Sequence, residues 1–373
     1  MNMINNKKTI LNLLATAGIN VNGGNPWDIQ VHDEKFYDRA LAGGSIGLGE
    51  TYMDKLWDCE KVDEFFCRVL NANLEKVIKK NPTVIAESLI TKMINRQTQS
   101  HSYKNAQRHY DIGNDLFSKM LDKRLVYTCA YWKNAANLDE AQENKLDLVC
   151  RKLGLEEGMH VADIGCGWGS FAKFAAEKYK VKVTGITVSK EQVALGNQLC
   201  AGLPVEIKLM DYRDLTGKFD RVAAIGCLEH IGQKNHRTFM EVASRCLPDD
   251  GLFLMHTIGN AVTRTHPDPW LAKYIFPNYL VPSIRQVAKA FEGIFVMEDW
   301  QNFGTDYDKT LMAWYENFIT HYDELRDKYD ERFYRMWNYY LLLCAGSFRA
   351  KRNLLWQVVF SKKGRKGVYQ AVR

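Results

Sequence analysis

The chain has 373 residues, of which 46% are hydrophobic and 25% charged, as is typical of a soluble globular protein with two domains or a catalytic domain plus an extension. Its formal net charge of +6 is compatible with an anionic lipid surface or with nucleic acid and demonstrates neither. The nine cysteines stand singly, which argues against a disulfide framework or a metal site and favours reduced thiols in the cytosol. No segment approaches the roughly 20 apolar residues of a membrane span, so any membrane contact is expected to be peripheral.

The N-terminal region, residues 1–95, is predicted to form a small, mainly helical domain. Its first helix is predicted from apolar residues at helical spacing between Ile10 and Ala17. A signal peptide is the alternative, which the broken apolar run and the cysteine usage disfavour. Four glycines in the stretch 42–50 predict a turn or a close backbone approach instead of a helix interior. The polar run at 96–105 is predicted to be a linker, and residues 106–373 a second domain.

From about residue 145 the chain alternates between helical and strand-like segments. Helices are predicted at 141–153, 171–179 and 190–200, and strands at 159–164, 181–186, 205–210, 219–225 and 251–256. This alternation predicts an α/β domain whose parallel sheet is covered by helices on both faces. Sheets of this kind bind their ligands at the carboxyl ends of the strands.

The strongest local motif is Asp163-Ile164-Gly165-Cys166-Gly167-Trp168-Gly169-Ser170, between a predicted strand and a predicted helix. Glycines let the backbone approach a ligand closely, and the helix N-terminus supplies free amides. A nucleotide-like ligand is therefore predicted, with a tight turn that binds nothing as the alternative. The Gly-x-Gly-x-Gly spacing resembles the loop of Rossmann-like methyltransferases, which implies a sheet of that type and S-adenosylmethionine as the cofactor.

Two further strand ends carry candidate cofactor contacts. No carboxylate stands at the tip of the second strand, where most such methyltransferases bind the ribose. Thr187 and Gln192 are therefore the candidates for hydrogen bonds to the ribose or to the amino-acid tail. Asp211 and Tyr212 follow the third strand. The Asp211 carboxylate is a candidate acceptor for the adenine amino group, with an ordinary loop residue as the alternative.

Several short motifs occur in a characteristic order along nearly the full chain: Gln107–Phe117, Tyr127–Trp132, the glycine loop, Glu229–Gly232, His256–Gly259, Asp299–Gly304 and Cys344–Arg349. With these motifs the chain resembles the cyclopropane synthase family, which includes mycolic acid methyltransferases. Its N-terminal segment is similar to the extra domain of the bacterial phospholipid enzymes, which the mycolic acid enzymes lack. The resemblance therefore implies phospholipid acyl chains as the substrate.

The implied reaction, cyclopropanation of a cis double bond, sets what the site must do. An alkene is a weak nucleophile, so the sulfonium methyl must be held in line with it. Methylation leaves a carbocation, which aromatic faces stabilise and from which water must be excluded. Ring closure then needs a base that removes a proton from the transferred methyl group. In the family this base is understood to be a bound bicarbonate ion.

Carried over by motif, the bicarbonate would be held by Cys129, Glu229, His256, Ile258 through its backbone, and Tyr307. Glu229 is expected to orient the anion and to receive its proton, while His256 and Tyr307 donate hydrogen bonds to it. Each residue alone has an ordinary alternative: a small buried cysteine, a helix-start glutamate, a core histidine or a packed aromatic. Cys344 also matches the family, but its apolar neighbours are expected to raise its thiol pKa. It is interpreted as lining the site, with a catalytic role as the alternative.

The family motifs also add Tyr127 and Thr128 to the cofactor residues. Within the glycine loop, Cys166 and Trp168 have simple packing as the alternative. The resulting candidate set for S-adenosylmethionine is Tyr127, Thr128, Gly165, Cys166, Gly167, Trp168, Gly169, Thr187, Gln192, Asp211 and Tyr212.

The resemblance further implies a cytoplasmic homodimer, peripherally associated with the inner face of the cytoplasmic membrane, with residues 1–95 docking on the bilayer. Unsaturated phospholipid is the expected partner. Nucleic acid is not, because no stripe of Lys and Arg interleaved with aromatics is present. Three alternatives stay open: a lipid methyltransferase that leaves a methyl branch, an inactive lipid-binding scaffold, and a nucleic-acid methyltransferase suggested by the basic charge alone.

Overall fold

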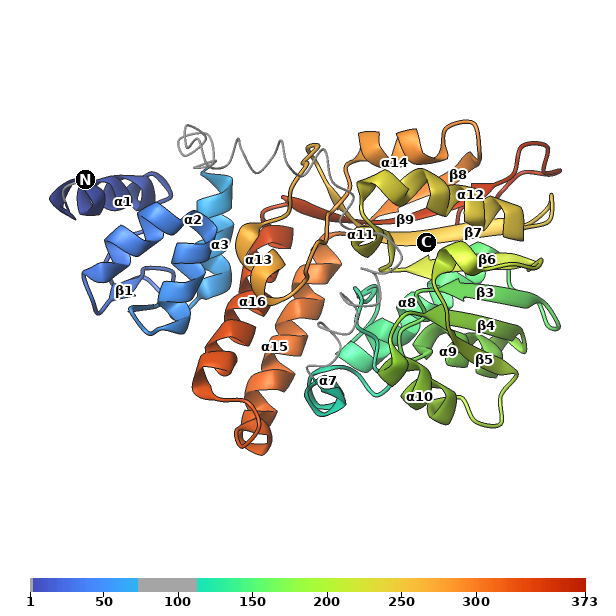
Figure 1. The fold of residues 1–373 in the computed structure, drawn as a ribbon, viewed down its shortest axis with the longest axis horizontal. Coiled ribbons are helices and arrows are strands. Elements are labelled where there is room, and N and C mark those ends of the chain that lie inside the picture. Colours follow the sequence, from blue (N-terminus) through green and yellow to red (C-terminus); the bar gives the residue numbers. More distant parts are fainter. Residues whose placement is uncertain (1–2, 73–112) are drawn as a thin grey trace. The chain divides into compact units, whose positions relative to one another are not determined.

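A computed structural model describes residues 3–72 and 113–373, so the predicted linker at 96–105 and the motif residues 107–112 lie outside the described residues. The described chain forms two compact units (Figure 1). The helical unit comprises residues 3–72, His266–Pro277 and Tyr307–Asn353, and the sheet unit comprises residues 113–265, Asn278–Asp306 and Leu354–Arg373. Each unit therefore combines stretches that are far apart in the sequence.

The sheet unit is built on seven strands in the order β5-β4-β3-β6-β7-β9-β8. Strands β5, β4, β3, β6 and β7 pair in parallel, while β8 and β9 pair antiparallel. The predicted α/β fold with a parallel sheet is thereby confirmed, and the antiparallel pair extends it. The strands are β3 (His160–Ile164), β4 (Lys182–Thr187), β5 (Val205–Leu209), β6 (Arg221–Ile225), β7 (Leu252–Asn260), β8 (Val296–Asn302) and β9 (Asn353–Ser361).

Helices cover both faces of this sheet because its strands carry apolar side chains on both sides. On β6, Ala223 belongs to one core cluster, and its neighbours Val222 and Ala224 belong to the other. The first cluster includes residues of α8 and α9, and the second includes residues of α12 and α14, which Figure 1 shows around the sheet. The helices are α7 (Asn114–Met120), α8 (Leu138–Leu153), α9 (Ser170–Tyr179), α10 (Lys190–Leu199), α11 (Leu228–Ile231), α12 (His236–Cys246) and α14 (Ile284–Phe291).

Local signals fix where the helices beside the site begin and end. The Asn137 side chain accepts a hydrogen bond from the Glu140 amide at the start of α8, and Gly154 ends the helix with a left-handed φ of 56°. The Ser189 hydroxyl accepts from the Gln192 amide at the start of α10. Gly154 ends α8 shortly before β3. The start of α10 follows β4 directly and therefore lies at the edge where ligands of such sheets bind.

The helical unit packs its N-terminal helices against two helices from later in the chain, α13 and α16. The Tyr339 ring lies 5.5 Å from the Tyr52 ring, 5.1 Å from Phe66 and 4.5 Å from Trp270. Such aromatic pairs contribute about 0.5–1.5 kcal/mol each beyond the area they bury. The predicted helical character of the N-terminal region is confirmed. The elements are α1 (Met3–Thr16), β1 (Gln30–Val31), α2 (Lys35–Met53), β2 (Trp57–Asp58), α3 (Val62–Asn71), α13 (Pro269–Tyr274), α15 (Thr305–Leu325) and α16 (Glu331–Arg349).

The glycine stretch 42–50 lies within the bounds of α2, but a kink at Gly44, with a φ of 53°, interrupts the helix there. The predicted turn is thus present at Gly44, while the residues on either side of it are helical. The predicted close approach is present, because a Cβ at Gly49 would collide with the Trp270 indole of α13. Glycine costs about 1 kcal/mol relative to alanine in a helix, and the packing of a buried tryptophan against the bare backbone outweighs that cost.

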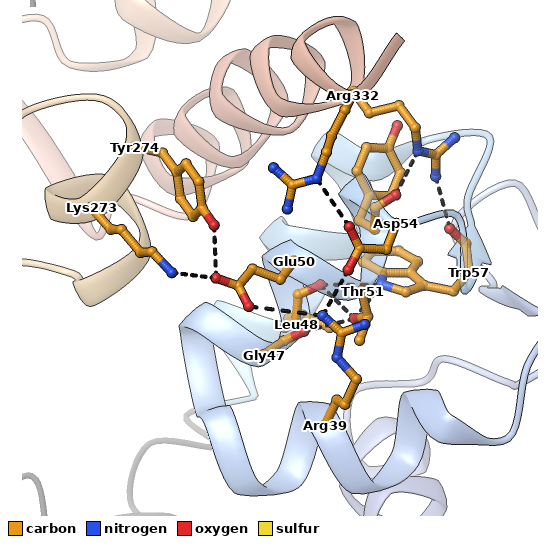
Figure 2. Close-up of polar contacts among 12 residues, drawn as sticks. Arg39, Gly47, Leu48, Glu50, Thr51, Asp54, Trp57, Lys273, Tyr274 and Arg332 are labelled. Atoms are coloured by element: carbon orange, nitrogen blue, oxygen red, sulfur yellow. Dashed lines mark hydrogen bonds and ion pairs between the residues drawn. The ribbon is translucent and has the colours of Figure 1, made fainter.

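Polar contacts around α2 hold the same helices together (Figure 2). The Glu50 carboxylate accepts hydrogen bonds from Lys273 Nζ at 2.6 Å and from the Tyr274 hydroxyl at 2.7 Å. Asp54, one turn further along, pairs with Arg39 at 2.7 Å and with Arg332 of α16 at 3.1 Å. The Lys273 hydrogen bond is the largest cause that keeps the pKa of Glu50 below its usual value, so this carboxylate is charged at neutral pH.

Candidate functional site

The predicted site residues of the sheet unit gather at the carboxyl ends of its parallel strands. The glycine loop follows β3, Thr187 ends β4, Asp211 follows β5 and Glu229 follows β6. His256 pairs with Ile225, the last residue of β6, and therefore lies at the same edge. Parallel strands thus bring together residues that are far apart in the sequence.

The three glycines of the loop all adopt left-handed dihedrals, but for different reasons. Their φ values are 79°, 57° and 80° at Gly165, Gly167 and Gly169, a region that side chains with a Cβ rarely occupy. A Cβ at Gly169 would lie 2.6 Å from Ile207 Cδ1, so this glycine lets the loop pack on β5. A Cβ at Gly167 would meet no atom within 4 Å, which leaves the backbone there open to a ligand.

Cys166 and Trp168, between these glycines, are buried against the protein. Cys166 packs so closely on β4 that a Cβ at Gly185 would lie 2.9 Å from its sulfur. The Trp168 indole donates a hydrogen bond to Asn114 Oδ1 at 3.1 Å, and its ring lies 5.1 Å from Phe117. These contacts place both side chains in the packing that holds the loop.

Thr187 and Gln192 contact each other at the end of β4. The Thr187 hydroxyl donates to Gln192 Oε1 at 2.6 Å, so the Gln192 NH₂ group is the part of this pair that can donate to a ligand. Asp211 is buried, and both of its carboxylate oxygens accept from Arg213 Nη1, at 2.8 and 3.0 Å. The predicted acceptor for adenine is therefore engaged by a neighbouring guanidinium. Tyr212 is buried in the core, with its ring 5.3 Å from Phe239.

The segment from Tyr127 to Cys129 is held by helix α8. Gln142 Nε2 donates to the Thr128 carbonyl at 2.8 Å, and Lys145 Nζ donates to the Thr128 hydroxyl at 2.6 Å. Both donors are completely buried. Cys129 is buried as well, while Tyr127 and Thr128 are half-buried. Two predicted cofactor residues and one predicted bicarbonate ligand are thus on one anchored segment.

Glu229 and Ile258 contact each other directly. Glu229 Oε1 accepts a hydrogen bond from the Ile258 amide at 2.5 Å, and Oε2 is buried with no hydrogen-bond partner among the described residues. Burial raises the pKa of Glu229 to about 7, although the Ile258 hydrogen bond opposes that shift. The Ile258 amide is therefore engaged by Glu229. Its carbonyl accepts from the Thr257 hydroxyl at 3.1 Å and retains a second lone pair.

His256 presents an unpartnered ring nitrogen at the same edge. Gln357 Nε2 lies 3.3 Å from His256 Nδ1, and with Gln357 as the donor the ring proton is on Nε2. That Nε2 atom is buried and, within the part of the chain that the structure describes, has no hydrogen-bond partner. Burial lowers the pKa of His256 well below its usual value, and nearby Lys145 lowers it further. The imidazole is therefore neutral and offers one N–H to a ligand.

Three buried polar residues were not named as site candidates from the sequence: Gln142, Lys145 and Asp163, the last of which opens the glycine-loop motif. Both Asp163 oxygens are buried without a hydrogen-bond partner in the described chain, and burial raises its pKa to about 7. Burial lowers the pKa of Lys145 to about 8, against the influence of Cys129, Asp122 and Asp163. Gln142 and Lys145 stand three residues apart on one face of the predicted helix 141–153, a pattern that is equally typical of a solvated helix face.

Two predicted site residues, Tyr307 and Cys344, belong to the helical unit. Tyr307 is on α15, where its ring packs 4.5 Å from Phe348. Cys344 is on α16, and burial raises the pKa of its thiol to about 12, so it is not a thiolate at neutral pH. This protonation state agrees with a lining role and not with a nucleophilic one.

Comparison with known proteins relates this site to a family. A family model described as mycolic acid cyclopropane synthetase matches residues 97–358. The cyclopropane-fatty-acyl-phospholipid synthase of Escherichia coli strain K12 is 50% identical over 350 residues, which cover 94% of this chain and 92% of that protein. A sphingolipid C9-methyltransferase of Komagataella phaffii is 32% identical over 71% of this chain and 59% of its own.

Solved structures give the same relationship. The cyclopropane synthase MmaA2 from Mycobacterium tuberculosis is 32% identical, with a TM-score of 0.66, and the match covers 70% of this chain and 98% of that one. The mycolic acid cyclopropane synthase CmaA1, complexed with SAH and CTAB, matches with the same identity, coverage and TM-score. Coclaurine N-methyltransferase, at 22% identity and a TM-score of 0.70 over 84% of this chain and 99% of that one, shares the fold. The chain therefore belongs to the mycolic acid cyclopropane synthetase family of S-adenosylmethionine-dependent methyltransferases.

Proposed function

We propose that the chain transfers a methylene group from S-adenosylmethionine to the cis double bond of unsaturated phospholipid acyl chains and forms a cyclopropane ring. The observation that carries this proposal is the pair of orphaned polar atoms, Glu229 Oε2 and His256 Nε2, buried at the carboxyl edge of the sheet. One of these atoms can accept and the other can donate a hydrogen bond, and both lie at the edge where ligands of such sheets bind. The identity to a bacterial phospholipid enzyme supports the substrate class.

The residues of the sheet unit fit S-adenosylmethionine. The open backbone at Gly167 and the N-terminus of α9 provide amides close to a ligand. The Gln192 amide and the Thr128 hydroxyl supply polar contacts beside that loop. Both Asp211 oxygens already accept from Arg213, and each keeps a lone pair that could accept from the adenine amino group. The proposed contacts therefore comprise the loop, Thr128, Gln192 and Asp211.

The orphaned atoms also fit a bicarbonate ion as an anion with one O–H group. The His256 Nε2–H group would donate to it, and the ionised Glu229 carboxylate would accept its hydroxyl proton. When bound there, bicarbonate would supply a base for the proton that the transferred methyl group must lose. Glu229 is held in place by the Ile258 amide, so one of its oxygens stays fixed while the other is available. Tyr307 is proposed as a further donor, as the family motif implies.

Two proposals concern the surroundings of the catalytic site. We infer that residues 1–95 dock on an anionic bilayer and that the protein acts as a homodimer peripherally bound at the cytoplasmic face. The net charge of +6 supports attraction to anionic lipid. No helix in the described residues is long and apolar enough to cross a membrane. Co-sedimentation with phosphatidylglycerol vesicles at low and high salt, together with light scattering for the mass, would test both proposals.

The reaction is tested with methyl-labelled S-adenosylmethionine and vesicles of cis-unsaturated phospholipid, followed by NMR of the released fatty acids. Labelled ring-methylene protons at high field are the expected result. A labelled methyl branch would favour the second candidate, a branching methyltransferase, which the 32% identity to a sphingolipid C9-methyltransferase supports. Lipid without any label would leave an inactive lipid-binding scaffold or a methyltransferase with another substrate, including nucleic acid.

A further inference from the structure

One face of helix α8 holds the segment that carries Thr128 by hydrogen bonds. Lys145 Nζ donates to the Thr128 hydroxyl at 2.6 Å, and Gln142 Nε2 donates to the Thr128 carbonyl at 2.8 Å. The Ala141 carbonyl accepts from the Tyr131 amide at 2.9 Å. The three residues of α8 lie within five positions of each other, on the side of the helix that faces this segment. The Thr128 side chain is therefore held from behind by a buried ammonium group.

The other side of Thr128 lies against the end of β6. A Cβ at Gly226 would stand 2.7 Å from Thr128 Cγ2, and the Gly226 amide donates to the His256 carbonyl at 2.8 Å. Thr128 is thus confined between α8 and the strand ends that carry the site. An ammonium group can only donate hydrogen bonds, so the Thr128 hydroxyl accepts from Lys145 and its own proton is available for a ligand.

A second buried lysine on α8 shows why Lys145 calls for a functional explanation. Lys152 is equally buried, and its ammonium lies 3.4 Å from Asp299, which Arg373 also contacts. Lys152 thereby belongs to a structural ion network. Among the described residues, no carboxylate lies within 4 Å of Lys145. Burying a charge without a close counter-ion is costly, and an apolar side chain would satisfy packing there.

We propose that Lys145 is a positioning residue that fixes the Thr128 hydroxyl as a hydrogen-bond donor to the carboxylate of the S-adenosylmethionine amino-acid tail. The inference rests on the proposed function only for the identity of the cofactor. It assigns Lys145 a role through Thr128, with no contact to the reacting methyl group. The carboxylate is the part of the cofactor that a polarised hydroxyl donor recognises, because charge-assisted hydrogen bonds are the stronger ones.

The test compares two probes that differ in this carboxylate. S-adenosylhomocysteine carries the amino-acid tail, and 5′-methylthioadenosine lacks it. Binding of both is measured by titration calorimetry for the full chain and for Lys145→Met, Thr128→Val, the double variant and Thr128→Ser. We expect Lys145→Met and Thr128→Val each to weaken S-adenosylhomocysteine about ten-fold or more and to leave methylthioadenosine unchanged. The double variant should resemble the single variants, because both remove the same interaction, and Thr128→Ser should bind like the natural chain.

Lys152→Met is the matched control, since it removes the other buried ammonium of α8. It should lower the midpoint of urea unfolding and leave the affinity for both probes unchanged. If Lys145→Met or Thr128→Val does not fold, the double variant replaces both polar partners by apolar groups and is expected to recover stability. Wild-type affinity of that double variant for S-adenosylhomocysteine would overturn the proposal, as would equal losses for the two probes.

The outcome is separable from that of the lipid reaction. Failure to form a cyclopropane ring would overturn the proposed function and leave the binding measurements intact. Equal affinity of Lys145→Met and the natural chain for S-adenosylhomocysteine would overturn the role of Lys145 even in a fully active synthase.

Discussion

At the scale of single residues, the two oxygens of Glu229 have different surroundings. One oxygen accepts from the Ile258 amide and the other is buried without a partner in the described chain. The first fixes the direction of the side chain, and the second is the atom that can take part in proton transfer. The family motif predicted Glu229 as a candidate, but only the fold assigns different tasks to its oxygens.

Replacing Glu229 by glutamine tests this division. The amide oxygen of the new side chain would still accept from Ile258, whereas an NH₂ group at the second position cannot receive a proton. We therefore expect Glu229→Gln to bind S-adenosylhomocysteine like the natural chain and to lose about 10²- to 10⁴-fold in turnover. Calorimetry and the labelled-lipid assay measure the two quantities. Undiminished turnover would remove Glu229 from the reaction.

The raised pKa of Glu229, at about 7, predicts a pH dependence. The carboxyl must be ionised to accept a proton, and its protonated fraction grows as the pH falls through 7. At a fixed bicarbonate concentration, kcat/KM should therefore decrease on the acid side with an apparent pKa near 7. Asp163 has a similarly raised pKa, so Asp163→Asn is the control. If the decrease of kcat/KM on the acid side disappeared in Asp163→Asn, that decrease would be due to Asp163 and not to Glu229.

At the same scale, the residues missed by sequence reasoning share a physical reason. A lysine in a helix normally extends to solvent, and nothing in the pattern around Lys145 distinguishes it from Lys152. Both are completely buried, but the partner of Lys145 is Thr128, in the segment before α8, whereas the partner of Lys152 is Asp299 of β8. Which partner a buried polar side chain meets is decided by tertiary packing, which one sequence does not display.

At the scale of elements, the parallel strands and their helices were predictable because their signals are local. Each buried strand is a short apolar run, whereas the cap at Asn137 was not recognised, so α8 begins at Leu138 and not at the predicted residue 141. The helical dihedrals on either side of Gly44 in α2 were not predictable from the glycines, because Gly49 packs against Trp270 of the distant α13. Local propensity is a weak guide where a distant helix packs on the backbone.

Close packing of α16 on α3 gives a prediction about stability. A Cβ at Gly346 would collide with the Asp63 carbonyl oxygen, so the two helices must move apart in Gly346→Ala. We expect a loss of about 1–3 kcal/mol in the free energy of unfolding. Gly43→Ala, in α2 and with no atom near the added Cβ, should change it by less than about 1 kcal/mol. Urea unfolding compares the two, and equal effects would contradict the assigned contact.

At the scale of the whole molecule, the N-terminal helices support helices that carry predicted site residues. Arg349 of α16 pairs with Asp63 of α3 at 2.6 Å and with Asp308 at 2.9 and 3.0 Å. Asp308 is the neighbour of Tyr307 on α15. Deleting the N-terminal segment would therefore disturb α15 and α16 as well as any bilayer contact. Loss of activity after such a deletion does not by itself demonstrate docking.

A full-length variant separates these two roles. Arg349→Met breaks the link between α3 and α15 and leaves the surface of the N-terminal helices in place. If the link positions Tyr307, the turnover of Arg349→Met should fall at least about ten-fold. The loss should be the same on vesicles and on detergent-dispersed phospholipid. A loss confined to vesicles would instead assign this contact to membrane docking.

The helical unit combines segments that are far apart in the sequence, which determines when it can fold during translation. The Arg335 guanidinium contacts the Tyr52 carbonyl, 283 residues earlier in the chain. At roughly 5–20 residues per second, a ribosome needs about 15–60 s to synthesise the stretch between them. Throughout that interval, the apolar faces of the newly made α2 and α3 lack the helix that will cover them. Completion of the helical unit therefore waits until translation of α16, after the central strands of the sheet unit have already emerged.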